Sequence, residues 1–217
     1  IEVLNGASAR TFGSQALNGI INIITRVENT SAIGVHAEGG SYGTIGGGAS
    51  ANLISKGFKN RLSTDYFHTD GAVTNSDFGR LRVFYQGNYK DDFTRLNWFA
   101  GYSGQRYGAN TFYSAKFPNQ WEEGQRYMAS FSAESLLGKI KLQPSASFVR
   151  NYDHFQLIRH SNTGENFHRT DVSSLRLCGS GKWLLGRTAA GLEMRHEGIL
   201  STNLGRPLDE DQYVSIE

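Results

Sequence analysis

Two glycine-rich stretches are the first candidates for chemistry, because such stretches can cradle phosphate groups. Residues 46–51 (GGGASA) match a G-x-G-x-x-A nucleotide fingerprint, but they lie inside an alternating, strand-like segment that no helix follows. Residues 179–182 (GSGK) resemble the end of a phosphate loop, yet Arg176 replaces the upstream glycine and Trp183 the Ser or Thr. Neither stretch predicts a nucleotide site. Small residues on a strand that let a neighbouring backbone come close explain residues 46–51 better.

Histidines and acidic residues offer no clear reaction centre. His154, His160 and His168 gather in one segment, but their spacing does not fit metal ligands on a strand or helix, which favours a solvated loop. The sequence contains no H-E-x-x-H pattern and pairs no nucleophile with a base. It therefore predicts no catalytic residue, no metal centre and no enzyme.

One loop could hold a cation. Asp70, Asn75 and Asp77 lie in the polar segment DGAVTNSDFG and could supply oxygen ligands to a calcium ion. A polar turn explains the same residues equally, so a loop calcium ion stays an open alternative and no other cofactor is expected.

The segment 107–124 (YGANTFYSAKFPNQWEEG) holds the most unusual residues outside the strand patterns. It is too rich in large aromatic residues for an ordinary exposed loop, and such clusters mark either a binding surface or packing against another loop. A second long loop near residues 154–168 contains Arg159. The candidate substrate-binding residues are Phe112, Tyr113, Phe117, Trp121 and Arg159.

The loops must be held in place by strands, which the pattern of the remaining sequence predicts. From about residue 31, apolar and polar residues alternate in about nine segments of about ten residues, a period that is typical of strands with two different faces. Leu62, Thr64 and Tyr66, for example, alternate with Arg61, Ser63 and Asp65. Short turns alternate with longer loops, as in a membrane β-barrel, and tyrosine and tryptophan residues near the strand ends fit an interfacial aromatic girdle.

A soluble β-sandwich or an adhesion module is the competing interpretation. A sandwich would leave the polar face in water and pack the apolar face against a second sheet, whereas a barrel would turn the polar face to an aqueous lumen. The strand length favours the barrel, because 9–11 residues cross a bilayer at a tilt.

Composition narrows the class further. The chain has 217 residues with 26 Gly, 10 Tyr, 13 Phe and one Cys, and its formal net charge is +2. Aromatic content of this kind argues against disorder, and the small net charge gives no reason to expect a nucleic acid as partner. A single cysteine, Cys178, excludes an internal disulfide.

The first 26 residues differ from the rest and carry a family resemblance. The run IEVLNG…ARTFGSQALNGIINIITR resembles the end of the plug domain of TonB-dependent outer-membrane receptors. The matching positions are Ile1, Glu2, Val3, Gly6, Phe12, Gly13, Gly19, Ile21, Asn22, Ile23, Ile24, Thr25 and Arg26. The loop ANTFYSAKFPNQWEE and the run HEGILSTNLGRPL look similar to the cobalamin-receptor branch.

The resemblance implies a division of the chain and a function. Residues 1–26 would be the C-terminal end of the plug, and residues 27–217 the first part of a transmembrane β-barrel. Large barrels of this family have about 22 strands, so the chain is expected to be a fragment forming an open, curved sheet.

The implied protein is a bacterial outer-membrane importer, surrounded by outer-membrane lipid and energised by the TonB–ExbB–ExbD complex. Its ligand would be cobalamin or a related corrinoid, with a siderophore or haem as the alternative. The residues implied as plug–wall contacts are Asn22, Arg26, Arg61, Asp65, Arg82 and Arg176.

Overall fold

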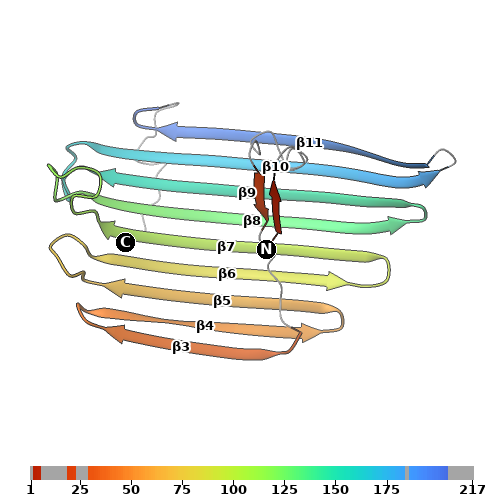
Figure 1. Cartoon of the computed structure of the whole chain (residues 1–217), viewed down its shortest axis with the longest axis horizontal. Coiled ribbons are helices and arrows are strands. Elements are labelled where there is room, and N and C mark those ends of the chain that lie inside the picture. The colour runs from red at the N-terminus through yellow and green to blue at the C-terminus, as the bar shows by residue number, and fades with distance from the viewer. Residues whose placement is uncertain (1, 6–18, 23–28, 184–185, 205–217) are drawn as a thin grey trace.

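The computed structural model describes residues 2–5, 19–22, 29–183 and 186–204, which form two antiparallel sheets (Figure 1). The small sheet pairs β1 (Glu2–Asn5) with β2 (Gly19–Asn22). The strands of the large sheet are β3 (Ala32–Gly40), β4 (Thr44–Ser55), β5 (Phe58–Thr69), β6 (Phe78–Lys90), β7 (Thr94–Gly108), β8 (Trp121–Leu137), β9 (Ile140–Gln156), β10 (Glu165–Trp183) and β11 (Gly186–Ser201).

The large sheet is a simple meander in which every strand pairs with its neighbours in the sequence. Its order runs from β3 to β11 without a crossover, so the prediction of nine antiparallel strands is confirmed. Tight hairpins make this order possible: Lys56 and Gly57, with φ of 45° and 86°, fit the two-residue turn whose twist matches paired strands. In the described part of the chain, β3 and β11 each pair on one side only.

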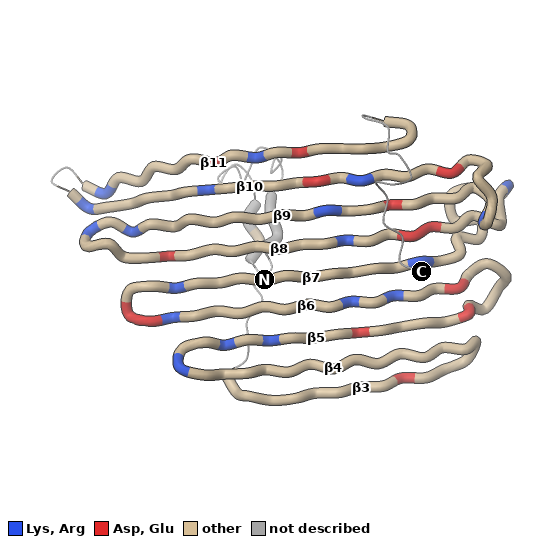
Figure 2. The backbone as a smooth tube through the Cα atoms, turned by 180° about the vertical axis from the view of Figure 1, so that it is seen from behind, with Lys and Arg blue, Asp and Glu red and all other residues tan. Residues whose placement is uncertain are grey.

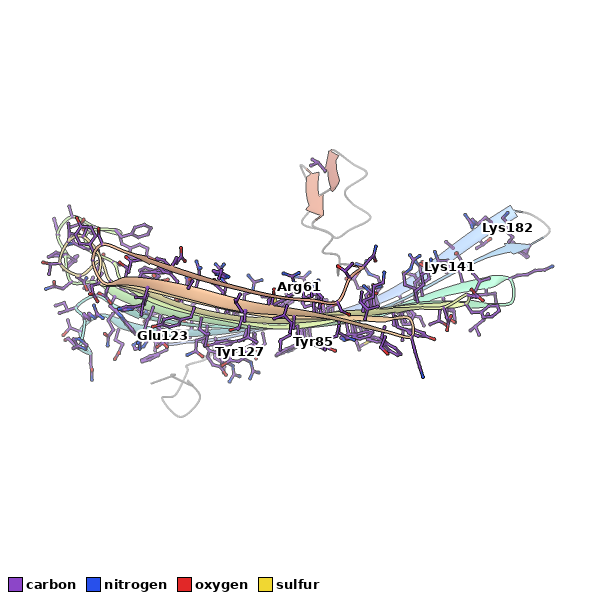
Figure 3. The ribbon with its side chains drawn as sticks, turned by 90° about the horizontal axis from the view of Figure 1, so that it is seen from below. Arg61, Tyr85, Glu123, Tyr127, Lys141 and Lys182 are labelled. Atoms are coloured by element: carbon purple, nitrogen blue, oxygen red, sulfur yellow. The ribbon has the colours of Figure 1, made fainter. Side chains whose placement is uncertain are left out.

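The strand register separates polar and apolar residues onto two faces. Arg61 lies opposite Asn52 and Gln86, whereas Leu62 lies opposite Ala51 and Tyr85. Because cross-strand partners share a face, this alternation continues through the sheet. Figure 3 shows Arg61 on one side, and Tyr85 and Tyr127 on the other. We call these the polar face and the apolar face.

The sheet is a single layer with almost no hydrophobic core. Among the described residues only two apolar side chains are buried, Ala109 and Tyr152. The apolar face instead exposes large side chains such as Val35 (79%) and Met194 (65%). A soluble monomer rarely exposes so extensive an apolar surface. The described residues therefore do not form the two packed layers of a soluble sandwich.

The polar face lies on the inside of the sheet's curve. The β1–β2 pair lies on that same side in Figure 3, away from the apolar face. Most of residues 1–26, including Arg26, lies outside the described residues, so their predicted domain assignment stays a prediction.

All strands of the large sheet except β3 are longer than the predicted ten residues. They lengthen from nine residues in β3 to nineteen in β10. The first long loop, expected at about residues 105–124 and including the segment 107–124, is limited to residues 109–120, and the loop expected near 154–168 is limited to 157–164. Both expectations were wrong because ladder hydrogen bonds continue past the point where alternation of side chains weakens. No helix long and apolar enough to cross a bilayer occurs among the described residues.

Candidate functional site

Long loops gather at one end of the large sheet and short turns at the other. Antiparallel strands place every second connection at the same end. Loops 70–77, 109–120 and 157–164 therefore lie together, with the short turn 41–43 beside them, while turns 56–57, 91–93 and 138–139 lie at the opposite end. This confirms the predicted asymmetry. We call the three loops the loop crown.

Arg159 joins two loops of the crown through an ion pair. Its Nη1 donates to Asp77 Oδ1 at 2.5 Å and to Asn75 Oδ1 at 3.1 Å, and its Nη2 donates to Asp77 Oδ2 at 3.0 Å. Burial alone would raise the pKa of Asp77, but the hydrogen bonds and charge of Arg159 outweigh it and hold the pKa below its ordinary value. The predicted substrate residue Arg159 is thus already engaged by a carboxylate of the protein.

Asn75 continues the connection into the third loop. Its Nδ2 donates to the carbonyl oxygens of Pro118 at 3.0 Å and Gln120 at 2.7 Å. The backbone of Asn75 has a positive φ of 56°, a conformation that asparagine tolerates better than most residues. The two alternatives for the aromatic loop, ligand contact and loop packing, are therefore not exclusive: polar groups hold the loop in place.

Aromatic side chains of the crown lie next to the polar face. Tyr113 packs edge-on against Phe112 at 4.8 Å and against Phe155 at 5.6 Å between ring centroids. Its hydroxyl donates to a carboxylate oxygen of Glu122, which with Phe155 belongs to the polar face by register. Burial and this hydrogen bond raise the pKa of Tyr113, which keeps the phenol neutral. Phe112 is nevertheless 73% exposed.

Two further predicted residues lie apart from this group. Phe117 is in the crown and 37% exposed, and its backbone nitrogen donates to the Ser114 carbonyl at 3.1 Å. Trp121 is not a loop residue but the first residue of β8, where its ring packs edge-on against His154 at 5.3 Å. We call Phe112, Tyr113 and Phe155 the aromatic patch. The sequence separates Phe155 from the other two by about forty residues, so only the strand pairing reveals that they meet.

The predicted calcium ligands are turned to other partners. Asp77 and Asn75 face Arg159, and Asp70 lies 3.2 Å from His68. No group of three or more His, Cys, Asp or Glu side chains in the described ranges could hold a metal ion.

The histidines follow a different pattern from the predicted solvated loop. His154 and His168 lie in β9 and β10, and only His160 lies in the loop. The His154 ring stacks on Phe167 at 4.2 Å, and its Nε2 is 2.7 Å from Glu165. That prediction was wrong because the two strands continue beyond the expected boundary and enclose His154 between cross-strand neighbours.

Charged residues of the polar face form local pairs within the sheet. Asp65 lies 2.8 Å from Arg80 and 3.5 Å from His36, and Arg82 is the cross-strand partner of Asp65. Arg176 pairs with Glu193 at 2.9 Å. Arg61, Asp65, Arg82 and Arg176 thus share one face, while Asn22 lies in β2. Whether these residues contact a plug stays a prediction. Figure 2 shows both charge signs spread over the sheet rather than gathered in one basic patch.

Residues 46–51 lie inside β4, as expected for packing rather than for a nucleotide site. A Cβ atom at Gly48 would come within 2.5 Å of the Thr64 carbonyl oxygen and 2.6 Å of the His36 ring. The glycine therefore permits a close approach of neighbouring strands. Residues 179–182 likewise lie within β10.

Comparison with known proteins identifies the fold. No family model matches this sequence, and no curated protein matches it. The structure is similar to the crystal structure of the siderophore receptor PiuA from Acinetobacter baumannii, with a TM-score of 0.69 and 13% sequence identity. The similarity covers 92% of this chain and 35% of that chain, so this chain spans about a third of the receptor's length. The predicted fold class, an open antiparallel wall of a β-barrel, is confirmed.

Proposed function

We propose that this chain is part of the wall of a TonB-dependent outer-membrane receptor that binds and imports a scarce, large nutrient. The observation that carries the proposal is the separation of faces in a single-layer sheet. One face exposes apolar side chains that lipid would cover, and the other carries Arg61, Asp65 and Arg82 toward the inside of the curve. The similarity to a solved transport receptor supports this class over an enzyme.

The parts of the structure take distinct roles in this proposal. The polar face lines an aqueous lumen, and the β1–β2 pair on the same side belongs to a plug that fills it. Extracellular ligand binds the loop crown, and the TonB–ExbB–ExbD complex pulls on the plug to open a passage. The apolar face lies in the bacterial outer membrane.

The ligand contacts in this proposal are the exposed rings of the aromatic patch, together with Phe117 elsewhere in the same loop. Aromatic rings bind flat, partly apolar molecules with little loss of side-chain entropy. Trp121 and Arg159 support this surface indirectly, because Trp121 packs on His154 and Arg159 holds Asp77.

The aromatic patch provides the test. In the full-length protein, Phe112→Ala combined with Tyr113→Ala should weaken ligand binding about tenfold or more, since central aromatic anchors dominate binding free energy. Phe93→Ala is the matched control, because Phe93 is 71% exposed but lies in a turn at the opposite end of the sheet. Equal affinity of both variants and the wild type would remove the patch from the site.

Two ligand classes fit this surface. Cobalamin follows from the sequence resemblance of the loop near Tyr113 and of the run at residues 196–208, whereas a siderophore follows from the name of the structural neighbour. Competition decides between them: binding of labelled cobalamin that ferric chelates do not displace would favour the corrinoid, and displacement by the chelates the siderophore.

A surface-attached adhesion module without transport is the rival class. The extended apolar face argues against it, because a soluble module would hide such a face. If the full-length protein stays folded and monomeric without detergent, the receptor proposal fails.

A further inference from the structure

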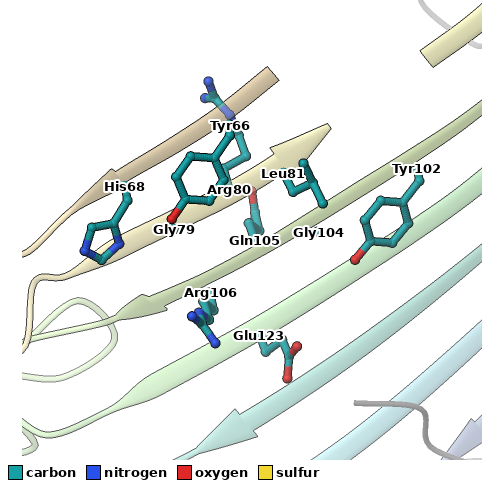
Figure 4. Close-up of a pocket in the computed structure, with 10 residues that line it drawn as sticks. All are labelled: Tyr66, His68, Gly79, Arg80, Leu81, Tyr102, Gly104, Gln105, Arg106 and Glu123. Carbon is teal, nitrogen blue, oxygen red and sulfur yellow. The ribbon is translucent and has the colours of Figure 1, made fainter. Parts of the chain in front are cut away.

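A groove crosses the apolar face close to the loop crown. It has a volume of about 200 Å³ and lies over β5, β6, β7 and β8 (Figure 4). Gly79 and Gly104 lie on its floor, where the absence of side chains leaves room for Arg106 above Gly79 and for the Tyr102 hydroxyl above Gly104. The residues that line its apolar-face walls are Tyr66, His68, Leu81, Tyr102, Arg106 and Glu123.

The groove lies where the apolar face changes from apolar to polar. On β5 the residues of this face change from Leu62 and Tyr66 to His68, and on β7 they change from Tyr102 to Arg106. Tyrosine rings prefer the boundary between hydrocarbon and water, where the headgroups of lipids lie. The row of tyrosines continues along the sheet, since Tyr102 and Tyr127 lie 5.0 Å apart between ring centroids. The groove therefore opens at the level of lipid headgroups.

Cationic groups stand just above this tyrosine row. Arg106 is exposed and reaches over Gly79, where its Nε would lie 3.7 Å from an added Cβ atom. His68 lies on the adjoining strand pair, and Glu123, the cross-strand partner of Arg106, is only 7% exposed. The exposed charge at the mouth of the groove is thus that of the arginine.

Further arginines lie on neighbouring strands, in register with the tyrosine row and with Gly104 rather than with Arg106. Arg150 and Arg169 both pair with Asp171, at 2.5 Å and 3.4 Å, and all three belong to the apolar face by register. Two guanidinium groups against one carboxylate leave one positive charge. Guanidinium groups bind phosphate well, so this cluster adds positive charge of a suitable kind to the apolar face.

We propose that this groove binds the phosphate-bearing headgroup of an outer-membrane lipid, with Arg106 as the phosphate ligand. The acyl chains then lie on Leu81 and the apolar residues below it, and the rings of Tyr66 and Tyr102 lie beside the headgroup. This inference rests on the proposed function only in taking the apolar face as lipid-exposed. It assigns a lipid site on the outside of the wall, separate from the nutrient site at the crown.

Retention of lipid by the full-length protein tests the site. The protein in detergent is mixed with phosphatidic acid or with diacylglycerol, which lacks the phosphate, and bound lipid is counted by native mass spectrometry. The wild type should retain phosphatidic acid in preference to diacylglycerol. Arg106→Gln should lower that retention about tenfold, the loss expected for one charge-assisted contact.

Arg126→Gln is the matched control. Arg126 is exposed and lies on β8 near the same level, but its cross-strand partners Ser103 and Asn151 place it on the polar face. The control should retain phosphatidic acid as the wild type does. Equal retention by the Arg106→Gln variant and the wild type would overturn the site.

Two further readouts separate the possible failures. A large excess of inorganic phosphate should leave the lipid bound, and displacement would overturn a lipid ligand in favour of a free phosphate. Uptake of nutrient by Arg106→Gln should match that of the wild type. The lipid site thus fails on lipid retention, whereas the receptor proposal fails on its own test, the detergent requirement.

Discussion

At the scale of single residues, the loop crown depends on side chains that are far apart in the sequence. Arg159 reaches Asp77 across 82 positions and Asn75 across 84. The ion pair is only partly exposed, and two parallel hydrogen bonds fix its geometry. Such a contact is worth more than an exposed ion pair, on the order of 1–2 kcal/mol.

The Asp77 pKa gives the crown a defined pH dependence. Because the folded-state pKa lies below the unfolded value of about 3.9, the stabilisation is fully present above that value and is lost as pH falls through the folded pKa. We expect amide protection factors in residues 109–120 to be constant from neutral pH to about pH 5 and to fall below about pH 4. Hydrogen exchange of the full-length protein measures this.

Arg159→Met should lower those protection factors at neutral pH and remove most of their acid dependence. Lys116→Met, which changes an exposed cation of the same loop, should do neither. Acid-dependent protection that persists in Arg159→Met would mean that another group is responsible.

At the scale of elements, the strand faces decide which substitutions the sheet tolerates. Leu62 and Ser63 are neighbours in β5, yet Leu62 lies on the apolar face and Ser63 on the polar face. Leu62→Arg should destabilise the membrane-inserted protein by about 2–4 kcal/mol. Ser63→Arg should cost much less, because it faces the lumen in the proposed arrangement.

Folding titrations of the full-length protein into lipid vesicles measure both free energies. A similar cost for the two arginine substitutions would show that the two faces do not meet different surroundings.

The faces were predictable from sequence because a period of two needs only the neighbouring residues. The alternation of Arg61, Leu62 and Ser63 in the sequence is the alternation in the structure. Strand ends were less predictable. Backbone hydrogen bonds between β9 and β10 continue to Gln156 and Glu165, where polar and apolar residues no longer alternate in the sequence. These hydrogen bonds join backbone groups, so the residue types at the strand ends give little indication of how far the pairing extends.

The crown was only partly predictable, because its contacts are set by which loops the sheet brings together. The sequence pointed to the aromatic residues, and Phe112 and Tyr113 do lie together beside the polar face. It could not show that Arg159 meets Asp77, since nothing local to either residue identifies the other. Trp121 was expected in a loop, but it begins a strand.

At the scale of the whole molecule, the open edges of the sheet matter most. In the described residues β3 and β11 carry unpaired backbone groups along one side, and the apolar face exposes large side chains. Open edges of this length pair readily with other chains. The 217-residue chain should therefore self-associate in detergent-free buffer and disperse in detergent micelles, as sedimentation velocity can measure. A stable monomer without detergent would contradict this view of the sheet.

The strict two-face alternation also limits how such a wall can vary. One extra residue inside any strand would move all later side chains of that strand to the opposite face, with arginines toward hydrocarbon and leucines toward water. Two extra residues would keep each later side chain on its face and only shift its position along the strand. Length changes are thus tolerated mainly in the connections, so new binding preferences can arise at the crown while the scaffold beneath keeps its register.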